Sequence, residues 1–248
     1  MLILSVLVGG FVGYKIGHTP PARLQTVTGS MIDRPEGEAD SSSQLDLYAA
    51  MRKLWTDHVI WTREYIVAAV DGSPVSEALT AALGNATGSI ATLPVVGETV
   101  SALGPGDAAA VRLLKNQEDI GNAVALYYGR EAGDKLTGLL KEHILIAVDI
   151  LNAAKDEDEA RMEAEDQKWR ENADEIATFL SEANPNWSKA DLTEMMYHHL
   201  DTTLAEATAR LNKNHGADVE AFDEVYDHIL TMSDALSAGI IAQFPEKF

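Results

Sequence analysis

Histidines are the residues of this chain whose type and spacing could support chemistry inside a fold, and the sequence has seven of them. His58 and His143 fall on apolar positions that recur at helical spacing, and His199 and His228 lie beside apolar residues on two later segments. Zinc, copper and iron ions favour imidazole, and helical bundles hold such ions or haem between inward-facing side chains. The spacing therefore predicts a transition-metal or haem site formed by these four histidines.

Three carboxylates could complete a mixed site of this kind, namely Glu64, Glu142 and Asp149. Helical spacing alone does not show whether they turn inward, so they rank second as ligands. Glu142 directly precedes His143 and therefore does not form the Glu-x-x-His pair typical of carboxylate-bridged di-iron bundles. The alternative is that each histidine is simply hydrogen-bonded in the core or at its margin.

Composition excludes several other classes of function. The chain has no cysteine, which removes disulfides, thiolate nucleophiles, iron–sulfur clusters and covalently attached c-type haem. Asp and Glu total 39 against 19 for Lys and Arg, and the formal charge of −20 argues against a nucleic-acid partner. No Gly-x-Ser-x-Gly elbow and no phosphate-binding loop are present, so nothing in the sequence indicates catalysis.

Long amphipathic helices are the elements that must position the histidines. On the first of them, Leu47, Met51, Leu54 and His58 trace one face at steps of three and four residues. Helices are predicted over residues 44–70, 107–126, 131–154, from the turn at 155–158 to 183, 188–212 and 217–244. Asp107 and Ser188 are the expected N-cap residues of two of them. The predicted fold class is all-α, an antiparallel up-and-down helical bundle with an N-terminal hydrophobic anchor helix.

The amino terminus predicts attachment to a membrane. Residues 1–17 are almost entirely apolar and lack both a basic n-region and a small-residue cleavage site, so they are expected to form an uncleaved anchor. Gly9, Gly13 and Gly17 repeat at four-residue spacing, which would let another helix approach closely and favours self-association. The side of the membrane that the rest of the chain faces stays open.

Two further segments separate the anchor from the helices and interrupt them. Residues 18–43 hold three prolines and a serine run and are expected to form a flexible linker, which leaves residues 44–248 as the bundle. Residues 71–106 are rich in glycine, proline and small apolar residues and are expected to form an insertion within it. Its apolar residues could be buried against the bundle, a partner or a membrane.

Several strings resemble a family of small, uncharacterised bacterial and archaeal helical-bundle proteins. The strings are Leu54–Arg63, Arg112–Gln117, Glu142–Ala147, Asn184–Ser188 and Gln243–Pro245. Members of that family often carry labels such as glycosyltransferase or acetylglutamate kinase, but this chain lacks the strand–helix alternation and the phosphate loop that either activity would need. The resemblance implies the helical fold and transfers no catalytic residue.

Three functions are compatible with these features. The broadest is a membrane-tethered, non-enzymatic helical-bundle protein with a structural, assembly or accessory role. The alternative is binding of a transition metal or haem through the inward histidines. A third is a bundle that holds a small apolar molecule between its helices.

Overall fold

The protein is described here by a computed structural model that places residues 38–73 and 103–248. The described residues are almost entirely helical and contain no strand. The elements are α1 (Glu38–Val70), α3 (Pro105–Tyr128), α4 (Arg130–Lys155), α5 (Glu159–Ala183), α6 (Lys189–Leu211), α7 (His215–Gln243) and the short 3-10 turn η3 (Pro245–Lys247). The all-α prediction is confirmed for this part of the chain.

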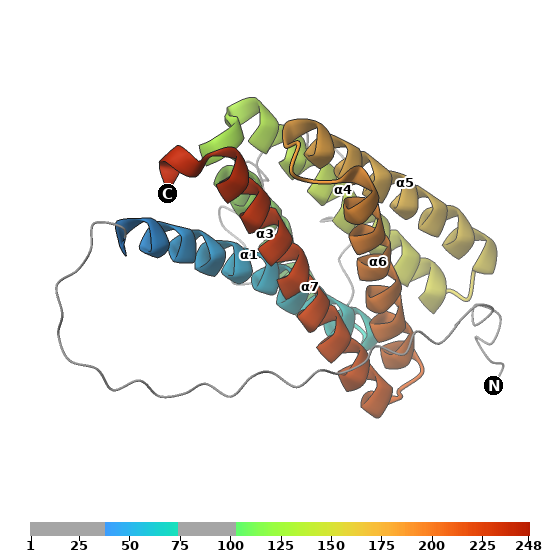
Figure 1. Cartoon of the computed structure of the whole chain (residues 1–248). Helices are drawn as coiled ribbons and strands as arrows, with labels where there is room; N and C mark the ends of the chain where they lie inside the picture. The colour runs from blue at the N-terminus through green and yellow to red at the C-terminus, as the bar shows by residue number, and fades with distance from the viewer. Residues whose placement is uncertain (1–37, 74–102) are drawn as a thin grey trace, which may run out of the picture. The chain divides into compact units, whose positions relative to one another are not determined.

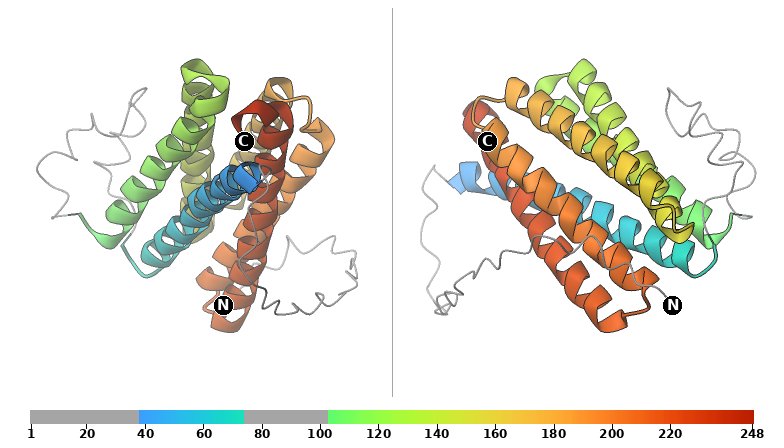
Figure 2. Two further views of the ribbon diagram at one scale, coloured as in Figure 1. Left: turned by 60° about the vertical axis from the view of Figure 1, so that its left-hand side comes forward. Right: turned by 90° about the vertical axis from the view of Figure 1, so that its right-hand side faces the viewer.

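The six long helices form a closed ring. Each helix packs against the next one in chain order, and α7 packs back against α1 (Figure 1). Successive helices run in opposite directions from α3 onward and are joined by short connections, as the two further views in Figure 2 show. Side chains from all six helices can therefore meet at the centre of the bundle.

The boundaries of the first two helices differ from the prediction. α1 begins at Glu38, inside the expected linker 18–43, and α3 begins at Pro105, inside the expected insertion 71–106. The anchor 1–17 with Gly9, Gly13 and Gly17, and most of the linker and insertion, lie outside the described residues. Within residues 38–73 and 103–248, none of the helices is both long and apolar enough to cross a membrane.

Local signals set most helix ends. Ser188 caps α6 by accepting a hydrogen bond from the Asp191 N–H at 3.4 Å, as predicted. The expected cap at Asp107 is wrong, because Pro105 already starts α3 and Asp107 lies in its first turn. Proline suits this position because its ring fixes φ near the helical value and the N–H it lacks would have no helical partner. Gly129 ends α3 with a φ of +85°, a conformation that glycine adopts without strain.

The core has two apolar clusters. The larger contains Met51, Trp55, Trp169, Leu200 and other residues from all six helices, and the smaller is built on α1, α3 and α4 around Ile66, Leu113 and Leu151. Along α7, four apolar residues recur as a stripe at steps of four and three and are all buried; they are Val225, Ile229, Met232 and Leu236. Burial of these stripes supplies the main stabilisation of the bundle.

Helices α3 and α4 cross at a pair of glycines. A Cβ atom on Gly133 would lie 2.5 Å from the carbonyl oxygen of Gly121 and 2.7 Å from the Cβ of Ala125. The first of these neighbours is backbone and cannot turn aside, so a side chain at this position would push the two helices apart.

We therefore expect Gly133→Ala to destabilise the protein by about 1–3 kcal/mol, even though alanine favours the helix by about 1 kcal/mol. Gly138→Ala is the matched control on the same helix, because a Cβ there meets nothing within 4 Å. The control should raise stability by about 0.5–1 kcal/mol. Urea denaturation of both variants checks the pair, and equal stabilisation by the two substitutions would contradict the close crossing.

Candidate metal centre: a histidine cluster in the core

Each of the six helices contributes one polar side chain to a connected group at the centre of the bundle. The group, called the histidine cluster below, consists of His58 (α1), Gln117 (α3), His143 (α4), Asn172 (α5), His199 (α6) and His228 (α7). His143 lies between Leu140 of the larger apolar cluster and Ile144 of the smaller one. The cluster is thus a polar break in an otherwise apolar core.

Three imidazoles form its centre. His58, His143 and His199 are 2%, 2% and 5% exposed. The ring centroid of His199 lies 5.7 Å from that of His58 and 6.0 Å from that of His143. The structure therefore brings together three of the four histidines that the sequence singled out, from three different helices.

The hydrogen bonds of Asn172 assign the tautomer of His143. The side-chain N–H of Asn172 donates to the carbonyl of Leu139 at 3.1 Å, which fixes the direction of the amide. Asn172 Oδ1 therefore accepts from the Nδ1–H of His143 at 2.9 Å. The Nε2 of neutral His143 then carries a lone pair, and this arrangement is the usual support of a metal-ligating histidine.

His58 has a buried amide partner as well, Gln117. Gln117 Nε2 donates to the carbonyl of Leu113 at 2.8 Å and lies 3.2 Å from Nδ1 of His58, so this nitrogen accepts. Gln117 Oε1 is buried without a partner. Gln117 Nε2 also donates to Oδ1 of Asn116 at 3.2 Å, so the direction of the amide is fixed as it is at Asn172, and neutral His58 has its proton on Nε2, the opposite tautomer to His143.

The innermost histidine has an unsatisfied nitrogen. Nδ1 of His199 is buried and has no hydrogen-bond partner in the described structure. The same holds for Oε1 of Gln117. Leaving a buried polar atom unpaired costs about 1–3 kcal/mol. A bound species that accepts the lone pairs of this cluster would offset that cost.

Burial keeps the three central imidazoles neutral. Desolvation, together with the charge that His143 would carry, lowers the pKa of His58 from 6.5 to about 3. Desolvation lowers the pKa of His143 to about 4, and it places the pKa of His199 well below 6.5. Neutral imidazole is the form that binds metal ions.

His228 stands at the margin of the cluster. It is half-buried, its Nε2–H donates to the carbonyl of Met195 at 2.8 Å, and its ring centroid lies 6.5 Å from that of His199. Its Nδ1 therefore holds the free lone pair in the neutral form. His228 is further from the centre than His58 and His143, and it could serve as a fourth ligand only after its ring moves.

The carboxylates of second rank do not join the cluster. Glu64 and Glu142 are exposed. Asp149 pairs with Arg161 at 3.0 Å, and its side chain is 47% exposed. A mixed histidine–carboxylate site at this place is therefore not formed by these residues, because the helix faces that carry them point outward.

The side chains of the histidine cluster are not yet arranged as the ligands of a metal ion. In the described residues, no three His, Asp or Glu side chains already stand as ligands of one metal ion. Binding through Nε2 would keep the hydrogen bond of His143 to Asn172, whereas the Nδ1 lone pair of His58 faces Gln117, so His58 would have to turn its ring or change its tautomer to bind an ion.

A cavity in the apolar core tests whether haem or a small apolar molecule could bind between the helices. It is enclosed by apolar residues including Met51, Trp55 and Leu140 and has a volume of about 20 Å³. That volume is close to the least that holds one water molecule, and it is far too small for a porphyrin or a drug-sized molecule. None of the cluster histidines lines this cavity, so its size argues against haem or a drug-sized apolar ligand at this place and does not bear on an ion at the histidine cluster.

The sequence prediction missed the two amides, Gln117 and Asn172. A signal for both was present, because each interrupts an apolar stripe: Gln117 follows Leu113 and precedes Ile120, and Asn172 lies between Trp169 and Ile176. A polar residue at such a position must have a buried partner.

Comparisons of the chain with family models, with curated proteins and with solved structures find no match, so the family resemblance of the strings quoted above stays a prediction.

Proposed function

We propose that this protein binds a transition-metal ion through His58, His143 and His199. The observation that carries the proposal is that the ring of His199 on α6 lies between two other buried, neutral imidazoles, with its centroid 5.7 Å from that of His58 on α1 and 6.0 Å from that of His143 on α4. Two imidazoles that bind one ion at about 2.0–2.1 Å in tetrahedral geometry have centroids at a comparable separation. Rotations of the side chains, rather than movements of the helices, would complete the site.

The donor set selects the class of ion. Three imidazole nitrogens without thiolate or carboxylate suit zinc, copper, nickel, cobalt or ferrous iron, and they do not suit calcium or magnesium, which prefer oxygen ligands. Three protein ligands leave a fourth position, which His228 or a water molecule would take. The hydrogen bond from His143 to Asn172 orients one of the ligands.

A structural or assembly role is the broader proposal, and it rests on other parts of the chain. Anchorage to a membrane and self-association would depend on residues 1–17 with Gly9, Gly13 and Gly17, which the structure does not describe. Removing residues 1–17 and measuring the oligomeric state by light scattering tests this role independently of metal binding.

Metal binding predicts near-stoichiometric uptake that depends on the central histidine. We expect the full-length chain, stripped with chelator and then dialysed against Zn²⁺, Cu²⁺ or Co²⁺, to retain about one ion per chain, and His199→Ala to lose it. Asn172→Leu should weaken the affinity by about 10–100-fold, because it frees the ring of His143. Elemental analysis and the visible spectrum of the cobalt form measure both.

His215→Ala is the matched control, since His215 is exposed at the start of α7, away from the cluster. His215→Ala should retain the same amount of metal ion per chain as the wild type. Circular dichroism confirms that each variant keeps its helices. A wild-type protein without metal after reconstitution with each ion, or unchanged uptake by His199→Ala, would refute the proposal.

A further inference from the structure

A chain of rings leads from the histidine cluster to the surface. His199 is 6.5 Å from His228 between ring centroids, and His228 is 4.4 Å from His198 with the rings nearly perpendicular. Exposure rises along this series, because His199 is buried, His228 is half-buried and His198 is exposed. The rings thus connect the buried centre to solvent between α6 and α7.

Within the described residues, the ring contacts that lead away from His58 and His143 end on the buried side chains of Trp55 and Trp169. His58, Gln117, His143 and Asn172 are at most 4% exposed. Most of the buried side chains of the bundle belong to the two apolar core clusters. A divalent ion cannot cross such an apolar region without ligands at an acceptable cost, because the desolvation penalty of an unpaired charge is very large.

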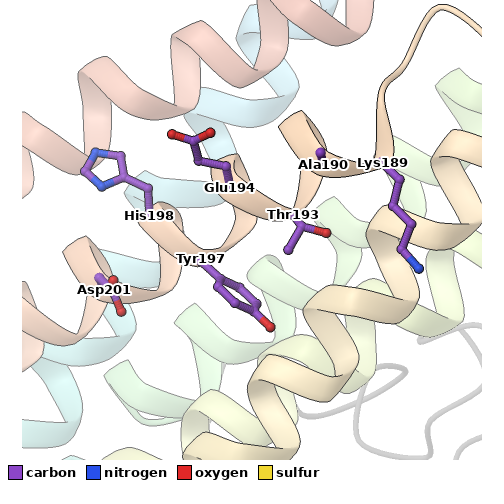
Figure 3. A pocket seen from close by; sticks show the side chains of 7 residues that line it. All are labelled: Lys189, Ala190, Thr193, Glu194, Tyr197, His198 and Asp201. Carbon is purple, nitrogen blue, oxygen red and sulfur yellow. The ribbon is translucent and has the colours of Figure 1, made fainter.

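The outer end of the chain of rings lies on an open groove of mixed charge. His198 and Glu194 line this groove together with Asp201 and Tyr197. Figure 3 shows Glu194 and His198 projecting to one side of α6 and Tyr197 to the other. The side of α6 that carries His198 is therefore the side that faces His228 on α7. Asp201 is paired with Arg170 at 2.8 Å and Lys189 lines the same groove, so Glu194 and the net charge of −20 are the features that would raise the local concentration of cations.

We propose that His198 and His228 form the access route by which a transition-metal ion passes between solvent and the histidine cluster. The ion would exchange from one imidazole to the next, so that it keeps a nitrogen ligand while it leaves water. In neutral His228 the Nε2–H donates to the carbonyl of Met195, so the lone pair on Nδ1 is available to bind the passing ion. This inference rests on the metal-binding function proposed above and adds the path to the site.

The route predicts a change in rate without a change in final binding. His198→Ala should slow the loading of Co²⁺ into the stripped full-length protein by about tenfold. Extraction of the loaded ion by a chelator should slow by the same factor, because the ion leaves by the route that it enters. The final absorbance of the cobalt form should be unchanged. Stopped-flow absorbance measures both rates, and His198 is exposed, so its replacement leaves the core intact.

His215→Ala is again the control, since it removes an exposed histidine thirteen residues before His228 on the same helix, about 20 Å away along the axis. It should leave both rates at the wild-type value. If the wild type takes up cobalt and His198→Ala takes it up at the same rate, the route is overturned and the binding function is not. A lower final absorbance in His198→Ala would make His198 a ligand and would also overturn it. No cobalt uptake by the wild type would overturn the binding function together with the route.

Discussion

Acidification from pH 6.5 to 5 should strongly destabilise the metal-free protein. The pKa of His58 is lowered to about 3 and that of His143 to about 4, and the pKa of His199 is lowered as well, in each case mainly by burial. In the unfolded chain these groups would titrate near 6.5. Their contribution to stability is therefore fully present above pH 6.5 and is lost as the pH falls, since only the unfolded state takes up the protons.

The magnitude follows from linkage. For each such histidine, the free energy of unfolding falls by about 1.4 kcal/mol per pH unit of acidification, over the range between its pKa in the unfolded chain and its lower pKa in the folded protein. Glu206 acts in the opposite direction, because burial raises its pKa to about 7 against the lowering by Arg63. Its stabilising contribution is present below about pH 4.5 and is lost as the pH rises toward 7, so it cancels about one histidine. His58 and His143 together, less the offset by Glu206, give a net loss of about 1.4 kcal/mol per pH unit, and the lowered pKa values of His199 and His228 add to this loss.

Self-repulsion predicts the opposite sign. A chain of net charge −20 becomes less negative on acidification, and this alone would stabilise the folded state. Urea denaturation at pH 7.5, 6.5, 5.5 and 5, in the presence of chelator, distinguishes the two effects. His143→Gln should reduce the slope of stability against pH by about 1.4 kcal/mol per unit, whereas His215→Gln should leave it unchanged. Stability that rises on acidification would contradict burial of neutral histidines.

The sequence predicts the helices and most of the histidine cluster for one physical reason. Inward positions recur at steps of three and four, so Val225 and Ile229, like His58 and His143, could be assigned to the core from spacing alone. Burial in the structure confirms these assignments. The outward position of Glu64 and Glu142 could not be decided in the same way, because the width of the buried face depends on how many helices surround each one.

Spacing could not show which helices meet. The closed ring brings α7 back against α1, and this order depends on packing over the whole bundle rather than on any local pattern. For that reason the sequence did not predict the pairing of His143 with Asn172 or of His58 with Gln117. No signal in the sequence indicated the buried carboxylates of Glu206 and Asp218 either, which are 1% and 2% exposed, because their burial depends on an arginine of a distant helix.

Removing the arginine that neutralises these carboxylates should be among the most damaging single substitutions. Arg63 Nη1 lies 2.6 Å from Glu206 and 2.8 Å from Asp218, and its guanidinium stacks over Phe222 at 4.6 Å. Asp218 keeps a second partner in Arg210 at 3.3 Å, whereas Glu206 would be left buried without a counter-charge. We expect Arg63→Leu to cost about 3–5 kcal/mol near pH 8, the usual cost of breaking a buried ion pair from one side.

The cost should depend on pH and on Glu206. Below pH 7 the raised pKa of Glu206 favours its neutral form, so Arg63→Leu should cost less at pH 6 than at pH 8. In a Glu206→Gln background the same substitution should cost at least about 1.5 kcal/mol less, because no ionised carboxylate is left unpaired. Denaturation curves of the four proteins of this double-mutant cycle, at both pH values, provide the measurement.

Arg170 provides the matched control for burial. It also holds two carboxylates, Asp166 at 3.0 Å and Asp201 at 2.8 Å, and stacks over Tyr197, but the side chains of Asp166 and Asp201 are 32% and 57% exposed. Water solvates these carboxylates when the arginine is removed, so Arg170→Leu should cost less than about 1 kcal/mol. Equal costs at Arg63 and Arg170 would mean that burial does not set the strength of the Arg63 pairs. If Arg63→Leu costs much more stability than Arg170→Leu, and this difference becomes smaller in the Glu206→Gln background, the extra cost comes from the desolvated carboxylate of Glu206.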